Sequence, residues 1–142
     1  MVYKKELIRE RLKELDIVLE ELSKYKEKKP LHLQKSLSLR WSVERGLIAV
    51  ATLVFDIINH ILSSHFGVYP ETYKNSIEIL SDKKVISRGL HREMKGLGGL
   101  RNILVHEYTE IDLKLVCDHL RKGLETFPKF SKEIQKWMRQ SE

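Results

Sequence analysis

Apolar residues recur at alternating steps of four and three along the start of the chain, and this spacing constrains the fold most strongly. Between Tyr3 and Lys26 the apolar positions are Ile8, Leu12, Leu15, Leu19 and Leu22. Residues at that spacing lie along one face of an α-helix and form the contact line of a bundle. The segment ends at residues 28–30, Lys-Lys-Pro, because proline disfavours continuation of a preceding helix.

The same reasoning predicts a longer second helix over residues 31–65. Its core line is Leu33, Leu37, Arg40, Glu44, Leu47, Ala51, Val54, Ile58 and Ile61. Arg40 and Glu44 lie one turn apart on this apolar line, and we expect them to pair because an unpaired buried charge is costly. Residues 67–70, Gly-Val-Tyr-Pro, end the segment. The proline suits the first position of a short third helix that runs to about Leu80.

Two further helices follow a connector at residues 81–84. The fourth is expected over Ser87–Val105, with an apolar face made by Leu90, Met94, Leu97 and Leu104. The last is expected to begin after Thr109, which forms a capping-box pattern with Asp112. Its core line is Leu113, Cys117, Leu120, Leu124, Phe127, Ile134 and Met138. Pro128 removes one backbone donor and predicts a kink in this helix.

The expected fold class is therefore all-α. We expect a single domain over residues 1–142, an antiparallel bundle of four main helices plus one short helix. The one cysteine, Cys117, lies in an apolar pattern and is expected in the core, which fits a reducing compartment. The first twenty residues are densely charged, so no signal peptide is visible. The longest apolar run, residues 46–55, is too short for a membrane span, and we expect a cytoplasmic protein with no membrane partner.

Positive charge suggests an anionic partner. The formal net charge is +6, and nucleic acid is the commonest partner of a basic chain, although solubility alone is the alternative. On the fourth helix, steps of three or four join Arg88, His91, Lys95, Gly99, Asn102 and His106, with Arg92 beside them. This strip can bind a phosphate backbone, which makes Arg88, His91, Arg92 and Lys95 RNA-binding candidates. A solvated face is the alternative.

Two glycines, Gly98 and Gly99, lie inside the expected fourth helix. Each costs about 1 kcal/mol relative to alanine there. Such a cost is tolerated where the backbone must approach a second helix or a ligand, and a simple kink is the alternative. The six histidines show no recognised zinc spacing, and neither a phosphate-binding glycine loop nor a nucleophile triad is visible. We therefore expect neither metal nor cofactor.

The residues with the most reactive side chains are concentrated in Arg101–Tyr108, which reads R-N-I-L-V-H-E-Y. Cleavage of RNA by its own 2′-hydroxyl needs a group that moves a proton near neutral pH, which histidine can supply. It also needs a cation for the charge that grows on phosphorus, and the arginine fork suits phosphate. The octet offers both groups, together with the amide of Asn102.

Geometry and local structure leave alternatives for this octet. Arg101 and His106 are five residues apart, about 140° around a regular helix, so they do not share a face. A π-bulge, the long reach of arginine or a second subunit could close the gap. His106 also suits a helix end, where the helix dipole favours it. Tyr108 could form a hydrophobic staple with Leu113 if Thr109 is the N-cap.

The octet matches the R-x4-6-H-x-Y motif of HepT-like proteins of the HEPN superfamily. Residues 41–45, Trp-Ser-Val-Glu-Arg, followed by Asp56 and His60, resemble the second-helix pattern of that family. Residues 67–73 resemble its G-x-x-P-x-x-Y connection, and the final helix also fits the family layout. The resemblance covers nearly the whole chain.

The resemblance implies a HEPN-like helical bundle that forms a homodimer, with the two motifs lining a cleft. It implies a metal-independent endoribonuclease in which Arg101 and His106 are the catalytic pair. Asn102 matches the adjacent polar position and Tyr108 the tyrosine of the motif. It further implies a partner, a minimal nucleotidyltransferase antitoxin called MntA, that adds AMP to this tyrosine. Asp56, His60 and the Arg40–Glu44 pair receive no catalytic role.

The expected function is therefore the toxin of a type VII toxin–antitoxin system, an RNase that cuts RNA through 2′-hydroxyl attack and is neutralised by tyrosine AMPylation. A second hypothesis is a non-catalytic helical partner that binds a nucleotidyltransferase or a nucleotide, since a fold does not guarantee an activity. A third is a stand-alone structural bundle. The intact Arg101 and His106 pair favours the first.

Overall fold

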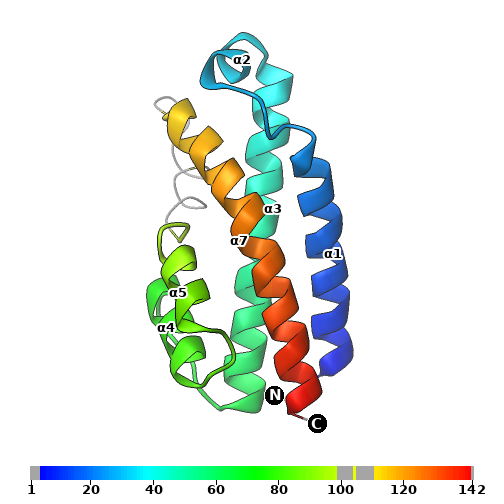
Figure 1. Ribbon diagram of the computed structural model, residues 1–142, viewed down its shortest axis with the longest axis vertical. Coiled ribbons are helices and arrows are strands. Elements are labelled where there is room, and N and C mark those ends of the chain that lie inside the picture. Colours follow the sequence, from blue (N-terminus) through cyan, green and yellow to red (C-terminus); the bar gives the residue numbers. More distant parts are fainter. Residues whose placement is uncertain (1–3, 99–103, 105–110, 142) are drawn as a thin grey trace.

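Three long helices lie side by side along the long axis of the molecule (Figure 1). They are α1 (Lys5–Ser23), α3 (Leu37–His60) and α7 (Leu113–Gln140). The structure, a computed structural model, describes residues 4–98, 104 and 111–141. Every regular element in these residues is a helix, which confirms the all-α expectation.

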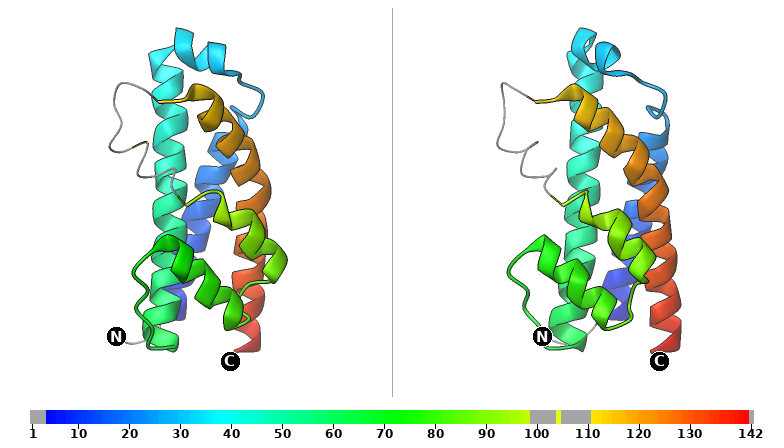
Figure 2. Two further views of the ribbon diagram at one scale, coloured as in Figure 1. Left: turned by 90° about the vertical axis from the view of Figure 1, so that its left-hand side faces the viewer. Right: turned by 60° about the vertical axis from the view of Figure 1, so that its left-hand side comes forward.

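Chain direction reverses between α1 and α3, and α7 runs in the same direction as α3 (Figure 1). Shorter helices complete the bundle on one side of these three: α4 (Tyr73–Asp82) packs on α3 and on α5 (Arg88–Lys95), and α5 packs on α7 (Figure 2). The first residue of α1 and the last residue of α7 lie at the same end of the bundle.

Most of the apolar side chains expected on the core lines are buried, while Ala51, Leu113 and Leu124 are half-buried. In α1 all five apolar residues of the first line are buried, and α1 packs chiefly on α3. By length and composition the continuous helical segment 37–65 could cross a membrane, with a mean hydropathy of 1.8 in its most apolar window. In the bundle this segment is the central helix, and much of its apolar surface is covered by α1, α4 and α7.

The second helix is not continuous over residues 31–65 as expected. A short helix, α2 (Pro30–Lys35), ends at Ser36, whose backbone is extended. The Ser36 hydroxyl then accepts a hydrogen bond from the Leu39 N–H and caps α3. A serine caps a helix from a non-helical backbone conformation, so the chain cannot stay helical through Ser36 even though the apolar spacing continues. The break turns Leu37 outward, where it is 52% exposed, and its assignment to the core line was wrong.

Arg40 and Glu44 pair on the first turns of α3, as expected. The Arg40 Nε donates to Glu44 Oε1 at 2.6 Å, and Glu44 is only 8% exposed. Of the remaining members of the line, Ala51 is half-buried, and the others are buried as expected: Leu33, Leu47, Val54, Ile58 and Ile61.

The third helix begins later than expected. After α3 the chain forms a π-helical turn, η1 (Ile61–His65), and reverses at Gly67, whose φ of +67° favours glycine. The Thr72 hydroxyl accepts from the Asn75 N–H at 3.0 Å, so α4 starts at Tyr73 and not at Pro70. The helix also continues two residues beyond Leu80, to Asp82, into the expected connector.

The expected fourth helix ends ten residues early. Ser87 caps α5 at the predicted start, but α5 stops at Lys95 and the chain turns through residues 96–98. The expected apolar face is nevertheless buried in full: Leu90, Met94, Leu97 and Leu104. The basic strip therefore does not run along one continuous helix, and its members Gly99, Asn102 and His106 lie outside the described residues.

Asp112, not Thr109, caps the last helix. Its Oδ1 accepts from the N–H groups of Lys114 and Leu115 at 3.0 and 3.3 Å, so α7 starts at Leu113. In this register the staple positions are Ile111 and Val116, and Tyr108, which was expected to form a staple with Leu113, lies outside the described residues. Helix α7 continues past Pro128 as one element.

Candidate functional site

The motif residues Arg101, Asn102, His106 and Tyr108 lie outside the described residues, so their expected positions stay predictions. The structure does describe both ends of the segment that carries them. This segment leaves the turn after α5 at Gly98 and reaches α7 at Ile111. The candidate site therefore consists of the residues that contact these two ends and of the surfaces beside them.

Tyr73 and Gly98 pack against each other where the segment begins. A Cβ placed on Gly98 would overlap the Tyr73 ring, so no larger residue fits there without displacement. This close approach confirms one of the two explanations for Gly98. The Tyr73 hydroxyl donates to the Met94 carbonyl at 3.4 Å, and its ring stacks on Phe55 with 6.0 Å between centroids.

Burial raises the pKa of Tyr73 well above its usual value, so the phenol stays protonated at neutral pH. The hydroxyl is already used as a donor to Met94. Tyr73 therefore positions the end of α5 and the turn at Gly98, and does not act as an acid or base. The resemblance had marked this tyrosine as part of a family pattern, without a structural reason.

Contacts with α7 fix α5 at both ends. Near its start, the Ser87 N–H and hydroxyl both donate to the Glu133 carboxylate, at 2.6 and 3.0 Å. At its end, the two ring nitrogens of His119 lie 2.9 Å from the Leu115 carbonyl oxygen and 3.0 Å from that of Gly96. Sequence reasoning missed both contacts because they require the packing of α5 on α7.

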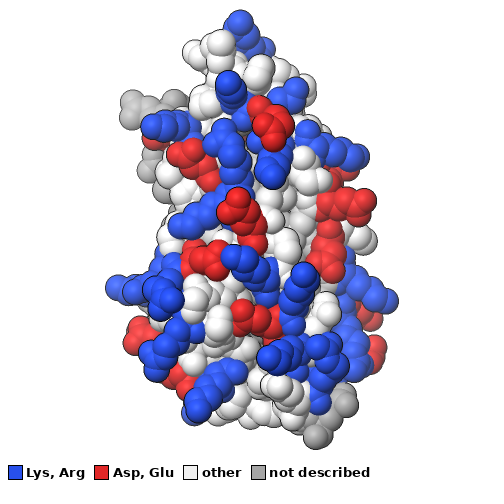
Figure 3. All heavy atoms as spheres, in the orientation of Figure 1, with Lys and Arg blue, Asp and Glu red and all other residues white. Residues whose placement is uncertain are grey.

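Three of the four RNA-binding candidates form an exposed basic face on α5. Arg88, Arg92 and Lys95 are exposed and follow steps of four and three, which places them on one side of the helix. Figure 3 shows lysine and arginine side chains on the α4–α5 side, as over the rest of this face, with acidic side chains among them. His91 differs from them, because its Nε2 is buried and has no hydrogen-bond partner among the described residues. His91 therefore presents less of its ring to a ligand than expected.

Two lysines of α7 lie near α5, and they differ in whether a carboxylate pairs with them. The Lys129 ammonium lies 2.9 Å from the Glu93 carboxylate, and this hydrogen bond raises the pKa of Lys129. Lys122 is exposed, and its Nζ lies 2.9 Å from the point where a Cβ on Gly96 would be. Lys122 therefore extends the basic face toward the start of the motif segment. The position of Lys122 in the sequence of α7 did not predict that it would lie beside the end of α5.

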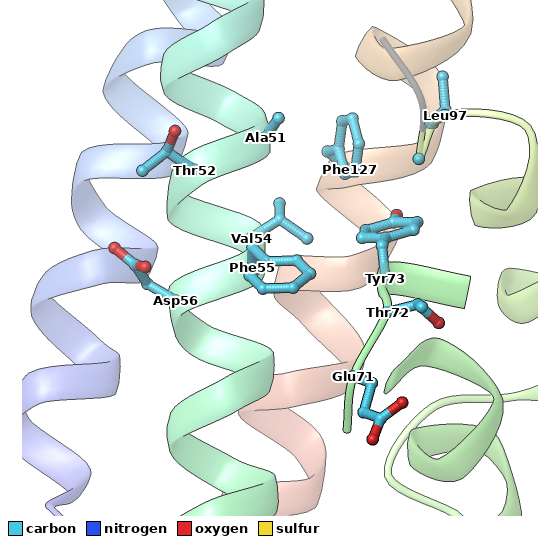
Figure 4. A pocket seen from close by; sticks show the side chains of 11 residues that line it. Ala51, Thr52, Val54, Phe55, Asp56, Glu71, Thr72, Tyr73, Leu97 and Phe127 are labelled. Carbon is cyan, nitrogen blue, oxygen red and sulfur yellow. The ribbon is translucent and has the colours of Figure 1, made fainter. Parts of the chain in front are cut away.

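A cavity of about 440 Å³ opens beside Gly98, between α3, the start of α4 and α7. Its walls are mainly apolar and aromatic, with Phe55, Tyr73 and Phe127 gathered at the centre (Figure 4). Two carboxylates, Asp56 and Glu71, lie at its edges. The cavity places an aromatic surface directly at the start of the motif segment.

Asp56 and His60 line a second, smaller cavity between α1 and α3. The His60 Nε2 accepts a hydrogen bond from the Lys4 N–H at 3.0 Å. Burial, and then the charge of Lys4, lower the pKa of His60. The described contacts tie the start of α1 to α3 and place His60 in the packing of the bundle. Among the residues that the structure describes, no three His, Cys, Asp or Glu side chains are grouped as a metal site requires.

Comparisons with known proteins agree with this architecture. The family described as Ribonuclease HepT-like matches residues 8–134. The chain is 31% identical over 97 residues to the mRNA nuclease HepT of Shewanella oneidensis, covering 68% of this chain and 73% of that protein. It is 28% identical over 95 residues to the tRNA nuclease HepT of Aphanizomenon flos-aquae, covering 67% of this chain and 65% of that protein.

Solved structures extend the agreement to the fold. The tri-AMPylated HEPN toxin of Shewanella oneidensis, solved in complex with an MNT antitoxin, superposes with a TM-score of 0.81 at 24% identity. The match covers 94% of this chain and 99% of the toxin. The family match and the shared fold together show that this chain belongs to the HepT-like ribonuclease family.

Proposed function

We propose that this protein is the toxin of a type VII toxin–antitoxin pair and acts as a metal-independent endoribonuclease. The observation that carries the proposal is the intact Arg101–Tyr108 motif in a chain of the HepT-like family. Two relatives are named as nucleases of mRNA and of tRNA, which supports RNA as the substrate class. Cytoplasmic localisation follows as part of the same proposal, because RNA of both kinds is found there.

The proposed reaction needs the RNA, water and side chains of the motif. The 2′-oxygen attacks the adjacent phosphorus, a new O–P bond forms, and the bond from phosphorus to the 5′-oxygen breaks. One proton leaves the 2′-hydroxyl and one reaches the leaving 5′-oxygen; His106 carries out one of these two transfers, and water carries out the other. Arg101 stabilises the negative charge on the phosphorane oxygens, and Asn102 supports the pair with its amide. The products are a 2′,3′-cyclic phosphate and a 5′-hydroxyl.

The basic face of α5 serves as the RNA-binding surface in this proposal. Arg88, Arg92 and Lys95 are exposed and lead toward the turn from which the motif segment departs. Contacts of this kind bind the phosphate backbone without reading its sequence. Lys122 adds a fourth cation beside that turn, and His91 contributes less.

Inactivation of the toxin depends on Tyr108 and on a second protein. We propose that a cognate MntA-like nucleotidyltransferase transfers AMP to the Tyr108 phenol. The added phosphate would compete for Arg101 and repel the RNA backbone. A tri-AMPylated HEPN toxin solved with its MNT antitoxin is the structural neighbour that supports this assignment.

A homodimer completes the proposed active unit. Arg101 and His106 are about 140° apart on a regular helix, so a second copy of the motif can supply the missing partner. Sedimentation at micromolar concentration should show a dimer. A monomer that still cleaves RNA would contradict this part of the proposal.

Analysis of the cleavage products tests the proposed chemistry. Wild-type protein should leave 2′,3′-cyclic phosphate and 5′-hydroxyl ends, which mass spectrometry of a short defined RNA distinguishes from other ends. Arg101→Ala should reduce the rate by at least about a hundredfold, the usual scale for one group that stabilises transition-state charge. An inactive wild type that binds a nucleotidyltransferase would instead favour the non-catalytic partner.

A further inference from the structure

One side of α3 faces outward along most of its length. Trp41, Arg45, Ile48, Thr52 and Asp56 recur at steps of four and three, so they lie along one side of the helix. All five are exposed or half-buried, and Trp41 is 61% exposed. Figure 4 shows Thr52 and Asp56 on the side of α3 that points away from the aromatic rings of the neighbouring cavity. We call these five residues the outer face of α3.

Apolar surface lies along the outer face and in the groove beside it. Ile17 of α1 lines this groove together with Ile48, Ala49 and Leu53 of α3, and Ile17 is 67% exposed. At one end of the face, Trp41 adds a large exposed ring. Exposed apolar surface with a polar rim is typical of sites that contact another protein. The outer face therefore fits a protein partner, and its charges indicate which one.

Neither charged side chain of the outer face is paired within the described residues. Arg45 and Asp56 are exposed, and neither side chain makes a hydrogen bond or an ion pair there. Among the charges of α1 beside them, Glu14 and Arg11 pair with each other at 3.2 Å. Glu14 lines the groove together with Arg45, and Arg11 lines a cavity together with Asp56. Arg45 and Asp56 can therefore both pair with a second molecule.

The two charges are placed symmetrically about the middle of the outer face. Arg45 precedes Ala49 by four residues, and Asp56 follows Thr52 by four. In a two-fold contact, a residue pair formed in one direction recurs in the other. When two α3 helices pack antiparallel with Ala49 opposite Thr52 of the second copy, each Arg45 lies opposite an Asp56. The small side chains at the crossing let the two helices approach closely, so the charged pairs on either side of it can form.

We propose that the outer face of α3 binds a second copy of this chain in an antiparallel, two-fold arrangement that forms two Arg45–Asp56 pairs. The contact covers Trp41 and the groove beside Ile17, which are exposed in a single copy. Both signs of charge are used within one chain, so the face is complementary to itself. This inference rests on the homodimer of the proposed function and assigns the surface through which that homodimer forms.

The proposed interface adjoins the start of the motif segment. Thr52 and Asp56 lie on the outer face and also line the cavity beside Gly98. Gly98 precedes Arg101 by three residues, which span at most about 11 Å. A two-fold contact through this face therefore places the start of both motif segments beside the same interface. A site shared between two copies of the motif requires this arrangement.

Charge reversal tests the interface. Arg45→Glu and Asp56→Arg should each raise the dimer dissociation constant by about tenfold to a hundredfold, because each replaces two attractive contacts by two repulsive ones. Sedimentation equilibrium measures the constant, and circular dichroism verifies that each variant keeps the helical fold. Lys132→Glu is the matched control, since it makes the same change of charge on an exposed residue of α7. It should leave the constant unchanged.

Mixing the two variants is the sharper experiment. In a heterodimer of Arg45→Glu with Asp56→Arg, one charged pair is Glu–Arg and the other is the original Arg–Asp. The equimolar mixture should therefore dimerise about as tightly as wild type, although each variant alone does not. Native mass spectrometry identifies the heterodimer by its mass. Misfolding of either variant cannot produce this recovery.

Trp41 provides a second measurement. The chain has two tryptophans, and Trp137 is only 9% exposed. Tryptophan emission of wild type should shift to shorter wavelength as protein concentration rises through the dissociation constant, because the second copy covers Trp41. Trp41→Phe keeps only Trp137 and should show no such shift. A wild-type dimer that forms without the shift would overturn the proposed contact.

Several outcomes contradict the interface without bearing on RNA cleavage. A monomeric wild type, a dimer that Arg45→Glu weakens no more than Lys132→Glu, or a mixture without heterodimer would overturn it. Variants that dimerise normally but no longer bind the nucleotidyltransferase would overturn it too, and would assign the outer face to that protein. Conversely, a wild type that forms this dimer but cuts no RNA would retain the interface and contradict the ribonuclease proposal.

Discussion

The ring of Tyr73 fills the space that any side chain at position 98 would need. Gly98→Ala should therefore destabilise the protein by about 1–3 kcal/mol, the usual cost of overpacking, and should lower RNA cleavage because the turn leads into the motif. Urea unfolding followed by circular dichroism measures the free energy, and a cleavage assay measures the rate.

Gly89→Ala is the control for this substitution. Gly89 lies inside α5, where an added Cβ would meet nothing closer than 3.9 Å. The alanine should stabilise the protein by about 0.5–1 kcal/mol, since glycine is a poor helix former. Equal effects of the two substitutions would show that the Tyr73 contact does not matter.

Single residues show how far sequence reasoning reached. The pairing of Arg40 with Glu44 could be predicted, because both lie on an apolar line where isolated charges are costly. The exposure of Leu37 could not, since it depends on Ser36 ending one helix and capping the next. His119 and Lys122 were missed for a related reason: their roles arise from the packing of α7 against the end of α5.

Among the helices, side-chain caps set the positions of helix ends, which apolar periodicity alone could not predict. Ser36, Thr72 and Asp112 each cap a helix through a side-chain oxygen, and each shifted a predicted boundary. Apolar spacing is insensitive to such breaks, because a helix and a turn can bury the same residues. Leu97 and Leu104 were predicted to be buried and are buried, although the helix expected to carry them ends at Lys95.

The basic face of α5 should contribute to the salt dependence of RNA binding. Each phosphate contact on single-stranded nucleic acid contributes about 0.7 to the slope of log K against log salt. Arg92→Ala should weaken binding and reduce the slope by about that amount, measured by fluorescence anisotropy with a short RNA and a cleavage-deficient background.

Lys129→Ala is matched to Arg92→Ala in net charge. Because the Lys129 ammonium is already paired with Glu93 at 2.9 Å, this variant should leave the slope unchanged. A slope that falls equally in both variants would argue for a general charge effect and against a binding face on α5.

The link between α1 and α3 should make stability depend on pH. Burial first, and then Lys4, lower the pKa of His60 in the folded state, and Arg11 and Asp56 line the same cavity. The unfolded chain then binds the proton more readily, so stability is retained above about pH 6.5 and is lost as pH falls below it toward the folded pKa. His60→Gln should reduce this loss in urea unfolding at about pH 7.5 and 5.5. If the exposed His32→Gln reduces it equally, His60 is not the cause.

At the scale of the whole molecule, fold class and family follow from patterns spread along the chain, whereas the site depends on contacts between distant segments. The all-helical bundle, its core and the HepT-like family could all be predicted. The cavity beside Gly98 could not, because its walls come from α3, the start of α4, the turn after α5 and α7. No single segment of the sequence contains enough of the lining residues to predict that cavity.

Regulation by the partner enzyme is also tested on the whole protein. Incubation with the cognate nucleotidyltransferase and ATP should add adenylyl mass to wild type and abolish its RNA cleavage. Tyr108→Phe should keep its cleavage activity and gain no mass, because it lacks the acceptor hydroxyl. A Phe variant that gains as much mass as wild type would remove Tyr108 from this role.

The most direct test of the proposed function is RNA cleavage by the purified protein in excess EDTA. Wild type should cut single-stranded RNA at an undiminished rate, because Arg101 and His106 supply the charge and the proton transfer. His106→Ala, with an unchanged circular dichroism spectrum, should lose at least about a hundredfold in rate. Loss of wild-type activity in EDTA that returns with a divalent cation, or full activity in His106→Ala, would contradict the metal-independent mechanism.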